Sequence, residues 1–304
     1  MPCSSTRAFP HRFRRVVDRR EHGEIAHTPL CRAENAAKLA NLRFLSLYDN
    51  NLWSLRRISV LGATACPRLV ELDIGKNDLG ELPEEFALLA HLERLWAEDN
   101  HLRAFPPALL RLRRLKELRL SNNQIDSVPE AVGDALGDLE VLAVDNNQLA
   151  ALPAGLGRLT KLRKLIARGN RIEALPDALV ARLAQLEVCA VSSNRLAALP
   201  AFEGCPRLRA LYANGNRIRA VPPHLASLAD LTKVNLANNE IASDGLPPAV
   251  AKKWGFAPAA GAGEGAGEGA GADGDVGMAA VEVDATLAGN PVVRPAPEVV
   301  VVEE

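Results

Sequence analysis

The chain has 304 residues, which suggests one large domain or two small ones. Lys and Arg (36) nearly balance Asp and Glu (37), which argues against a nucleic-acid binder that relies on strong overall positive charge. Five scattered cysteines do not suggest a disulfide scaffold, and no apolar run approaches the roughly 18 to 20 residues of a membrane span. We therefore expect a soluble protein of a reducing compartment.

The first 23 residues precede any repeat and are rich in arginine. The first 17 contain four arginines and no acidic residue. This composition predicts that residues 1–23 form a disordered basic arm. The alternative is that residues 1–22 act as an organelle transit peptide, because such peptides are rich in Arg and Ser and poor in acids. Residues 24–41 include a helix-favouring stretch, and we expect them to form an N-terminal cap over the first repeat.

Residues 42–256 carry one pattern nine times. It reads Leu-x-x-Leu-x-Leu-x-x-Asn, and most copies close with Leu-Pro or a variant of it. The asparagines stand at positions 50, 77, 100, 123, 147, 170, 194, 216 and 239. Leucines two apart match the period of a strand, so both point inward. Each copy is too short to bury its own apolar side, so neighbouring copies must stack and share one core, with their strands in a parallel sheet. The asparagine amide, buried at the turn, is expected to bond backbone groups of adjacent turns.

This pattern resembles the leucine-rich-repeat family, and in particular its short class with a 23-residue step. The step and the Leu-Pro endings are most similar to the Ras-group-related intracellular leucine-rich-repeat proteins, although similar repeats occur in scaffold proteins of the scribble and erbin type. The resemblance implies an α/β fold, a right-handed solenoid with a curved parallel sheet on its concave face and short helical or irregular segments on its convex face. It also implies a non-catalytic, cytoplasmic signalling adaptor or scaffold, with a small GTPase or a phosphatase as partner class.

The chain changes character after the nine repeats. Trp254 is expected to pack over the open end of the core. Residues 257–280 are rich in Gly, Ala and acidic residues, and we expect a flexible insertion because such a tract cannot bury enough apolar surface to offset its ordering entropy. Residues 281–293 match the second half of a repeat, although Glu282 stands where the first leucine belongs, and they predict a degenerate terminal repeat. The alternative is a disordered tail with an accidental match, and residues 294–304 are expected to be a disordered tail.

Three cysteines occupy repeat positions. Cys66 and Cys205 stand in an inward slot three residues before the first leucine, and Cys189 replaces the second leucine of its repeat. Because these slots are otherwise leucines, we expect three small buried hydrophobic residues without a metal or redox role.

No pattern in the sequence predicts catalysis, a cofactor or a metal site. The six histidines form no His-x-x-x-His pair, the cysteines form no Cys-x-x-Cys pair, and no GxxxxGK phosphate loop occurs. The glycine tract alternates with period two, so it does not match the GxGxxG dinucleotide motif. The residues that follow the repeats are too few for a separate enzyme domain. We therefore expect a protein that is not an enzyme.

Function is expected on the exposed face of the strands. Two residues of each repeat point to the concave surface: the one between the second and third leucines and the one after the third. Aromatic residues and arginine at these positions are typical of protein interfaces. We predict a protein partner that contacts Tyr48, Asp73, Trp96, Glu98, Arg119, Asp145, Ile166, Arg168 and Tyr212. The alternation of acidic and basic residues argues against a nucleic-acid partner.

Three alternatives to this hypothesis remain open at the level of the sequence. The aromatic residues could cover their cross-strand neighbours and contribute only to the stability of the sheet. The chain could be a regulatory subunit that controls a partner enzyme such as a phosphatase. It could also be an organellar structural repeat protein, delivered by the basic arm.

Overall fold

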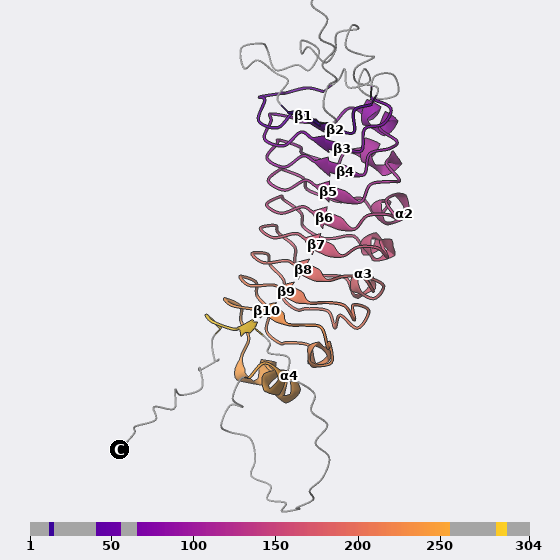
Figure 1. The fold of residues 1–304 in the computed structure, drawn as a ribbon. Helices are drawn as coiled ribbons and strands as arrows, with labels where there is room; N and C mark the ends of the chain where they lie inside the picture. Colours follow the sequence, from indigo (N-terminus) through magenta and orange to yellow (C-terminus); the bar gives the residue numbers. More distant parts are fainter. Residues whose placement is uncertain (1–11, 15–40, 56–65, 256–283, 291–304) are drawn as a thin grey trace, which may run out of the picture.

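The computed structural model describes residues 12–14, 41–55, 66–255 and 284–290. Within these residues eleven short strands form one parallel sheet, and their order in space follows their order in the chain (Figure 1). The strands are β1 (Arg12–Arg14), β2 (Phe44–Ser46), β3 (Glu71–Asp73), β4 (Arg94–Trp96), β5 (Glu117–Arg119), β6 (Val141–Ala143), β7 (Lys164–Ile166), β8 (Val188–Ala190), β9 (Ala210–Tyr212), β10 (Lys233–Asn235) and β11 (Asp284–Thr286). The chain therefore rises by one turn of a coil for each repeat.

The strands are in register, repeat on repeat. Leu72 of β3 pairs with Leu95 of β4, which pairs with Leu118 of β5, and all three side chains are fully buried. Because the equivalent apolar residues of successive turns stack in this way, the apolar side chains form one continuous core along the coil. The side chains on either side of each central leucine point away from this core, toward the inner face of the sheet.

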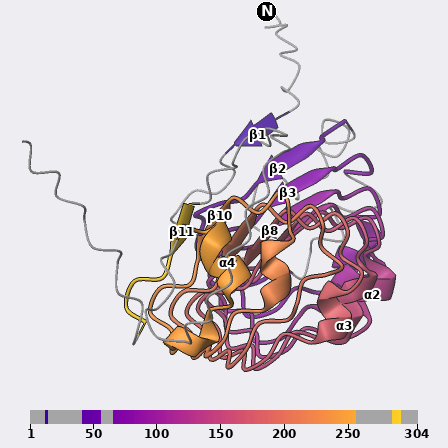
Figure 2. The same ribbon diagram turned by 90° about the horizontal axis from the view of Figure 1, so that it is seen from below.

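Short helical segments lie across the core from the sheet. They are η6 (Glu84–Leu88), η7 (Pro107–Arg111), α2 (Val132–Ala135), η8 (Ala154–Arg158), α3 (Asp177–Val180), η9 (Pro223–Ala226), η10 (Ser243–Gly245) and α4 (Pro248–Lys253). Figures 1 and 2 show α2 and α3 on the side opposite the strands, and α4 at the C-terminal end of the coil. Several of these segments begin directly after a proline, such as Pro83 before η6 and Pro153 before η8. Proline suits the start of a helix because the N–H it lacks would have no partner there.

The asparagines of the repeats join successive turns through their side chains. Asn123 is representative: its Nδ2 donates to the carbonyls of Ala97 (3.0 Å) and Leu120 (3.0 Å), and its Oδ1 accepts from the N–H of Leu102 (3.0 Å). All nine repeat asparagines are buried. The prediction that this amide bonds backbone groups of adjacent turns is confirmed.

The N-terminal edge of the sheet carries a strand that the repeat pattern does not predict. Residues 12–14, which lie within the predicted basic arm, form β1 and pair in parallel with β2. Pairing of this kind depends on backbone groups at an open sheet edge, so a leucine pattern is not required. The predicted cap at residues 24–41 lies outside the described residues, apart from residue 41.

At the other end, β11 pairs in parallel with β10. Asn290, which lies in the segment interpreted as a degenerate terminal repeat, makes contacts equivalent to those of Asn123. Its Nδ2 donates to the carbonyls of Leu236 (2.9 Å) and Leu287 (2.8 Å), and its Oδ1 accepts from the N–H of Ile241 (3.0 Å). The predicted flexible insertion at 257–280 and the tail at 294–304 lie outside the described residues.

Helix α4 closes the C-terminal end of the core. Val250 and Trp254 are buried there, as expected for Trp254. Lys253 Nζ donates to the carbonyls of Ala226 (3.1 Å) and Leu228 (2.6 Å), which ties α4 to the preceding turn. Partial burial lowers the pKa of this lysine.

The three repeat cysteines are buried free thiols, as expected. Burial raises the pKa of Cys66, Cys189 and Cys205 to about 12 in each case. A thiol with such a pKa stays protonated at neutral pH, so these residues act as small hydrophobic side chains.

Candidate functional site

The inner face of the sheet is an ordered grid of side chains. Strand register places Asp73, Trp96 and Arg119 beside one another on β3, β4 and β5. The same row continues through Ile166 on β7 and reaches Tyr212 on β9. The row predicted from the repeat pattern therefore lies on one face of the molecule.

An open groove of about 720 Å³ lies on this face, across β2 to β7. Seven of the nine predicted residues line it: Tyr48, Asp73, Trp96, Glu98, Arg119, Asp145 and Ile166. The structure thus brings most of the predicted set together in one concavity. Arg168 and Tyr212 do not belong to its lining.

The groove also includes seven residues outside the predicted set: Asp99, Glu117, Ser121, Asn122, Val141, Ala143 and Lys164. Glu117, Val141 and Lys164 each precede the second leucine of a repeat. The alternation of a strand places that position on the same face, so a strict period-two analysis would have included them.

Trp96 is held in place by its neighbours on the sheet. Its Nε1 donates to Glu117 Oε1 (3.2 Å), and its ring makes an edge contact with Phe44, with centroids 6.3 Å apart and planes at 64°. Trp96 is half-buried, so one part of the ring contacts the sheet while another part faces the groove. A side chain fixed in this way loses little conformational entropy when a ligand binds.

Tyr48 lies at the N-terminal end of the groove and is 48% exposed. Its ring lies against Gly75, where an added Cβ would be 3.2 Å from Tyr48 Cδ2 and 3.3 Å from Asp73 Oδ1. The absence of a side chain at Gly75 therefore leaves room for the tyrosine ring at this end of the groove. Lys76 Nζ lies 5.9 Å from the centroid of the ring.

Glu117 is the centre of a charged network beside Trp96. Its Oε1 accepts from Arg119 Nε (2.6 Å) as well as from the indole of Trp96, and its Oε2 lies 3.8 Å from Arg94 Nε. Arg119 also approaches Glu98, with 3.8 Å between Nη1 and Oε1. These contacts orient the arginine and the indole together.

Asp73 and Asp145 are bound by neutral donors. Asp73 accepts from the hydroxyl of Ser46 (3.1 Å) and the N–H of Gly75 (3.1 Å). Asp145 accepts from the hydroxyl of Ser121 (3.3 Å) and the backbone N–H of Arg168 (2.8 Å). Neither carboxylate takes part in an ion pair with another described residue.

Glu98 is a partly buried carboxylate of the groove, and its pKa is raised above the usual value. Its partial burial raises its pKa, and the negative charges of Asp73 and Asp99 raise it further. A hydrogen bond to its own backbone and the charge of Arg119 act in the opposite direction. The pKa of Glu98 is therefore raised chiefly by burial, and the negative charges of Asp73 and Asp99 are smaller contributions in the same direction.

The remaining two predicted residues pair with each other. The guanidinium carbon of Arg168 lies 5.4 Å from the centroid of the Tyr212 ring.

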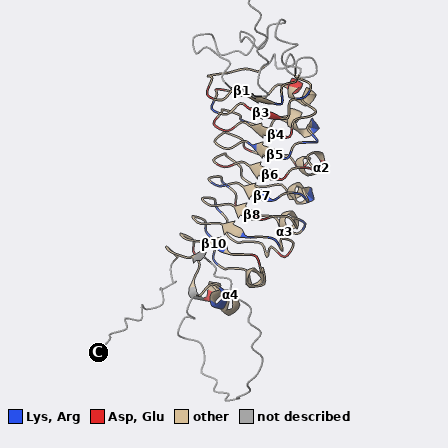
Figure 3. Cartoon of the chain, viewed as in Figure 1, with Lys and Arg blue, Asp and Glu red and all other residues tan. Residues whose placement is uncertain are grey.

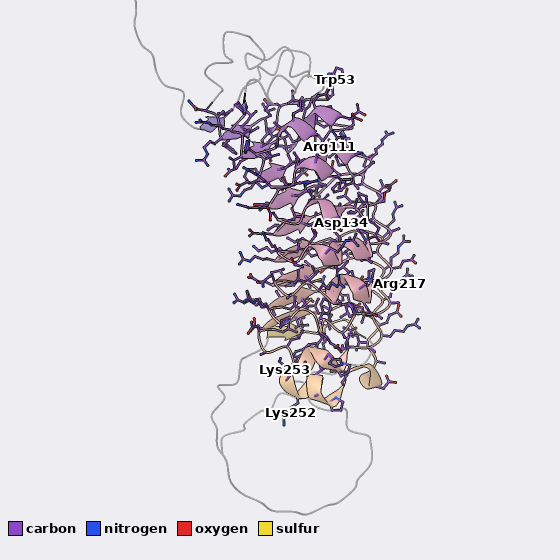
Figure 4. All side chains as sticks on the ribbon, turned by 90° about the vertical axis from the view of Figure 1, so that its right-hand side faces the viewer. Trp53, Arg111, Asp134, Arg217, Lys252 and Lys253 are labelled. Atoms are coloured by element: carbon purple, nitrogen blue, oxygen red, sulfur yellow. The ribbon has the colours of Figure 1, made fainter. Side chains whose placement is uncertain are left out.

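Along the coil, charged residues of both signs are found over its whole length (Figure 3). Trp53, an aromatic residue outside the groove, is 55% exposed and lies at the N-terminal end of the coil (Figure 4), where it lines a smaller pocket with Gly80 and Pro83.

The part of the chain that the structure describes contains no group of three or more His, Cys, Asp or Glu side chains that could hold a metal ion. Across these same residues, no helix has the length and apolar character needed to cross a membrane.

Comparisons with known proteins agree with this architecture. A family model described as "Leucine rich repeat" matches residues 113–172 and 160–218. The chain is 36% identical over 96 residues to "Leucine-rich repeat serine/threonine-protein kinase 1" of Mus musculus, a stretch that covers 30% of this chain and 5% of that protein. The chain thus matches only a small part of this relative, within its repeat region.

Solved structures share the fold over most of the coil. A leucine-rich-repeat protein of Leptospira interrogans, LIC12759, superposes with a TM-score of 0.65 at 30% identity, covering 70% of this chain and 53% of that chain. The ectodomain of the plant receptor kinase GASSHO1/SCHENGEN3 from Arabidopsis thaliana, solved in complex with CASPARIAN STRIP INTEGRITY FACTOR 2, superposes with a TM-score of 0.58 at 27% identity, covering 66% of this chain and 27% of that chain. The predicted fold, a leucine-rich-repeat solenoid with a curved parallel sheet, is confirmed.

Proposed function

We propose that this chain is a non-catalytic interaction module that binds a protein partner in the groove on its inner sheet face. The observation that carries the proposal is the groove itself, which joins Trp96, Tyr48 and Arg119 in one concavity. Tryptophan, tyrosine and arginine dominate the binding energy of protein interfaces. Trp96 and Arg119 share Glu117 as a hydrogen-bond partner, so they are oriented before a partner arrives.

The comparisons support a protein or peptide as the ligand class. Leucine-rich-repeat domains generally act as protein-binding modules, and the GASSHO1/SCHENGEN3 ectodomain was solved with its factor bound. We extend this mode of action to the present chain by analogy of fold.

The finer assignment rests on the 23-residue step and the Leu-Pro endings. On that resemblance we propose a Ras-group-related, cytoplasmic signalling adaptor or scaffold, with a small GTPase or a phosphatase as partner class. If the partner is an enzyme, comparing its activity alone and in the purified complex will distinguish a scaffold from a regulatory subunit.

The direct test is affinity capture with a matched control. The full chain, the Trp96→Ala/Arg119→Ala variant and the Trp53→Ala variant are each used to capture proteins from cells of the source organism. Trp53 is exposed but lies outside the groove, so its replacement controls for loss of any surface tryptophan. Proteins that the full chain and Trp53→Ala capture should be lost from the groove variant.

The captured partner is then purified and titrated. We expect the groove variant to bind it at least tenfold more weakly than the full chain. An affinity that is equal for the full chain and the groove variant, with both folded, would contradict the proposal.

A further inference from the structure

The groove has an excess of negative charge. Five carboxylates line it, and two cationic side chains, Arg119 and Lys164, accompany them. The carboxylates are Asp73, Glu98, Asp99, Glu117 and Asp145. Arg119 Nε donates to Glu117 Oε1 at 2.6 Å, so the positive charge of Arg119 is offset largely by Glu117 and does little to neutralise the other carboxylates.

Three of these carboxylates take part in no ion pair with another described residue. The hydrogen-bond donors to Asp73 and Asp145 are hydroxyls and backbone N–H groups, and Asp99 accepts from the side-chain amide of Asn122 (2.8 Å). Neutral donors orient a carboxylate but leave its charge in place. A ligand that enters the groove therefore meets uncompensated negative charge.

One of these unpaired carboxylates, Asp73, lies between two aromatic side chains of the groove. Asp73 is on β3, between β2, whose following turn carries Tyr48, and β4, which carries Trp96. Aromatic faces and carboxylates both attract cations, and an arginine or lysine placed between them contacts both. Tyr48 already has one cation near its ring, Lys76 at 5.9 Å.

We infer that the groove recognises an extended peptide segment of the partner that places a lysine or arginine side chain between Tyr48 and Trp96, against Asp73 and Glu98. The inference rests on the proposed function and specifies the chemistry of its ligand. The groove extends from β2 to β7, and the five spacings between neighbouring strands, at about 4.8 Å each, give a length of roughly 24 Å. An extended segment of about seven residues spans that length.

The electrostatic state of Glu98 agrees with this assignment. Burial and the charges of Asp73 and Asp99 hold its pKa above the usual range. A ligand cation at this position would offset the repulsion among the three carboxylates. A ligand with an acidic side chain there would increase it, so the groove discriminates by charge sign as well as by shape.

The test is a selection of peptides on the full chain. A phage-displayed library of random 12-residue peptides is selected on the immobilised protein, and the enriched sequences are compared with the unselected library. We expect lysine or arginine to be enriched at one position at least fivefold. A synthetic peptide of the most enriched sequence should lose at least tenfold in affinity when that residue is replaced by glutamine.

The same peptide is titrated against two charge variants of the protein. Asp73→Asn/Glu98→Gln removes two groove carboxylates with little change of shape, and we expect at least a tenfold loss of affinity. Glu173→Gln/Asp230→Asn removes two exposed carboxylates outside the groove and should leave the affinity unchanged. The loss on the groove variant should shrink as salt rises, because screening weakens charge attraction.

The outcomes separate this inference from the proposed function. Selected peptides without a basic residue that lose binding to Trp96→Ala/Arg119→Ala would overturn the inference and leave the proposed function standing. Basic peptides that bind Asp73→Asn/Glu98→Gln as tightly as the unchanged protein would also overturn the inference. Peptides insensitive to every groove variant, or the absence of any enriched peptide, would count against a peptide-binding groove altogether.

Discussion

The guanidinium group of Arg168 lies over the ring of Tyr212, 5.4 Å from its centroid, although β8 separates the strands that carry them. The pair can form across β8 because the residues at the intervening positions are small: Ala190 at the end of β8 and Ser192 just after it. Both large residues are thereby engaged with each other at the C-terminal side of the groove.

We predict that this pair contributes more to stability than to binding. A double-mutant cycle of Arg168→Ala and Tyr212→Leu, measured by urea unfolding, should give a coupling energy of about 0.5–1 kcal/mol. Arg168→Ala should weaken partner binding less than threefold. A coupling energy of zero together with a tenfold loss of affinity would place Arg168 in the interface instead.

The hydrogen bonds of the repeat asparagines predict that replacing one of them by alanine lowers the free energy of unfolding substantially. Asn147 Nδ2 donates to Leu120 O (2.9 Å) and Val144 O (3.1 Å), and its Oδ1 accepts from Ile125 N (2.9 Å). Asn147→Ala leaves these buried backbone groups without partners, so the free energy of unfolding should fall by about 3 kcal/mol. Gln148→Ala, which truncates an exposed amide at the next residue, should change it by less than about 0.5 kcal/mol. Equal effects from the two variants would show that the amide does not hold the turns together.

Burial of the repeat thiols predicts their chemical behaviour. Because burial raises the pKa of Cys66, Cys189 and Cys205 to about 12, the native thiols should not react with Ellman's reagent at pH 8 and should all react after unfolding in guanidinium. A Cys3→Ser/Cys31→Ser background restricts the count to these three residues. The unfolded thiols ionise near pH 8.5, so the stability contributed by their burial is complete below that pH and decreases as pH rises above it. Fast labelling of the native protein would contradict the assignment.

The raised pKa of Glu98 predicts a pH-dependent contribution of this residue to stability. Its pKa is raised in the folded chain, so its contribution to stability is complete below the unfolded pKa, near 4.3, and is lost once pH exceeds the folded pKa. Glu98→Gln places a neutral side chain at this position, so the destabilisation caused by ionisation of Glu98 disappears. The melting temperature of the variant minus that of the unchanged protein should therefore be higher at pH 7 than at pH 3.5. Glu173→Gln, an exposed control, should show no such difference. A more favourable value at pH 3.5 would mean that Arg119, not burial, dominates at this carboxyl.

Much of the architecture could be predicted from the repeat spacing. Leu72, Leu95 and Leu118 stack because their repeats are equal in length, so the spacing predicts both the strands and the residues that share the inner face. Strand β1 could not be predicted in this way, because its pairing uses backbone groups at an open edge and carries no leucine pattern.

The details of the site depend on contacts that a one-dimensional pattern does not contain. The alternation of charges along the chain was visible in the sequence. The engagement of Arg119 by Glu117, which leaves the groove acidic, depends on a contact between two positions of one strand and on side-chain rotamers. The pairing of Arg168 with Tyr212 depends on the small residues of an intervening strand.

The most direct test of the groove as the binding site is site-specific photocrosslinking. Benzoylphenylalanine is introduced either at Ile166, which lines the groove, or at Ala181, which is exposed at the end of α3 across the core. We predict that the partner crosslinks from position 166 and not from position 181. Crosslinking from position 181 alone would place the partner on the outer side of the coil and contradict the account.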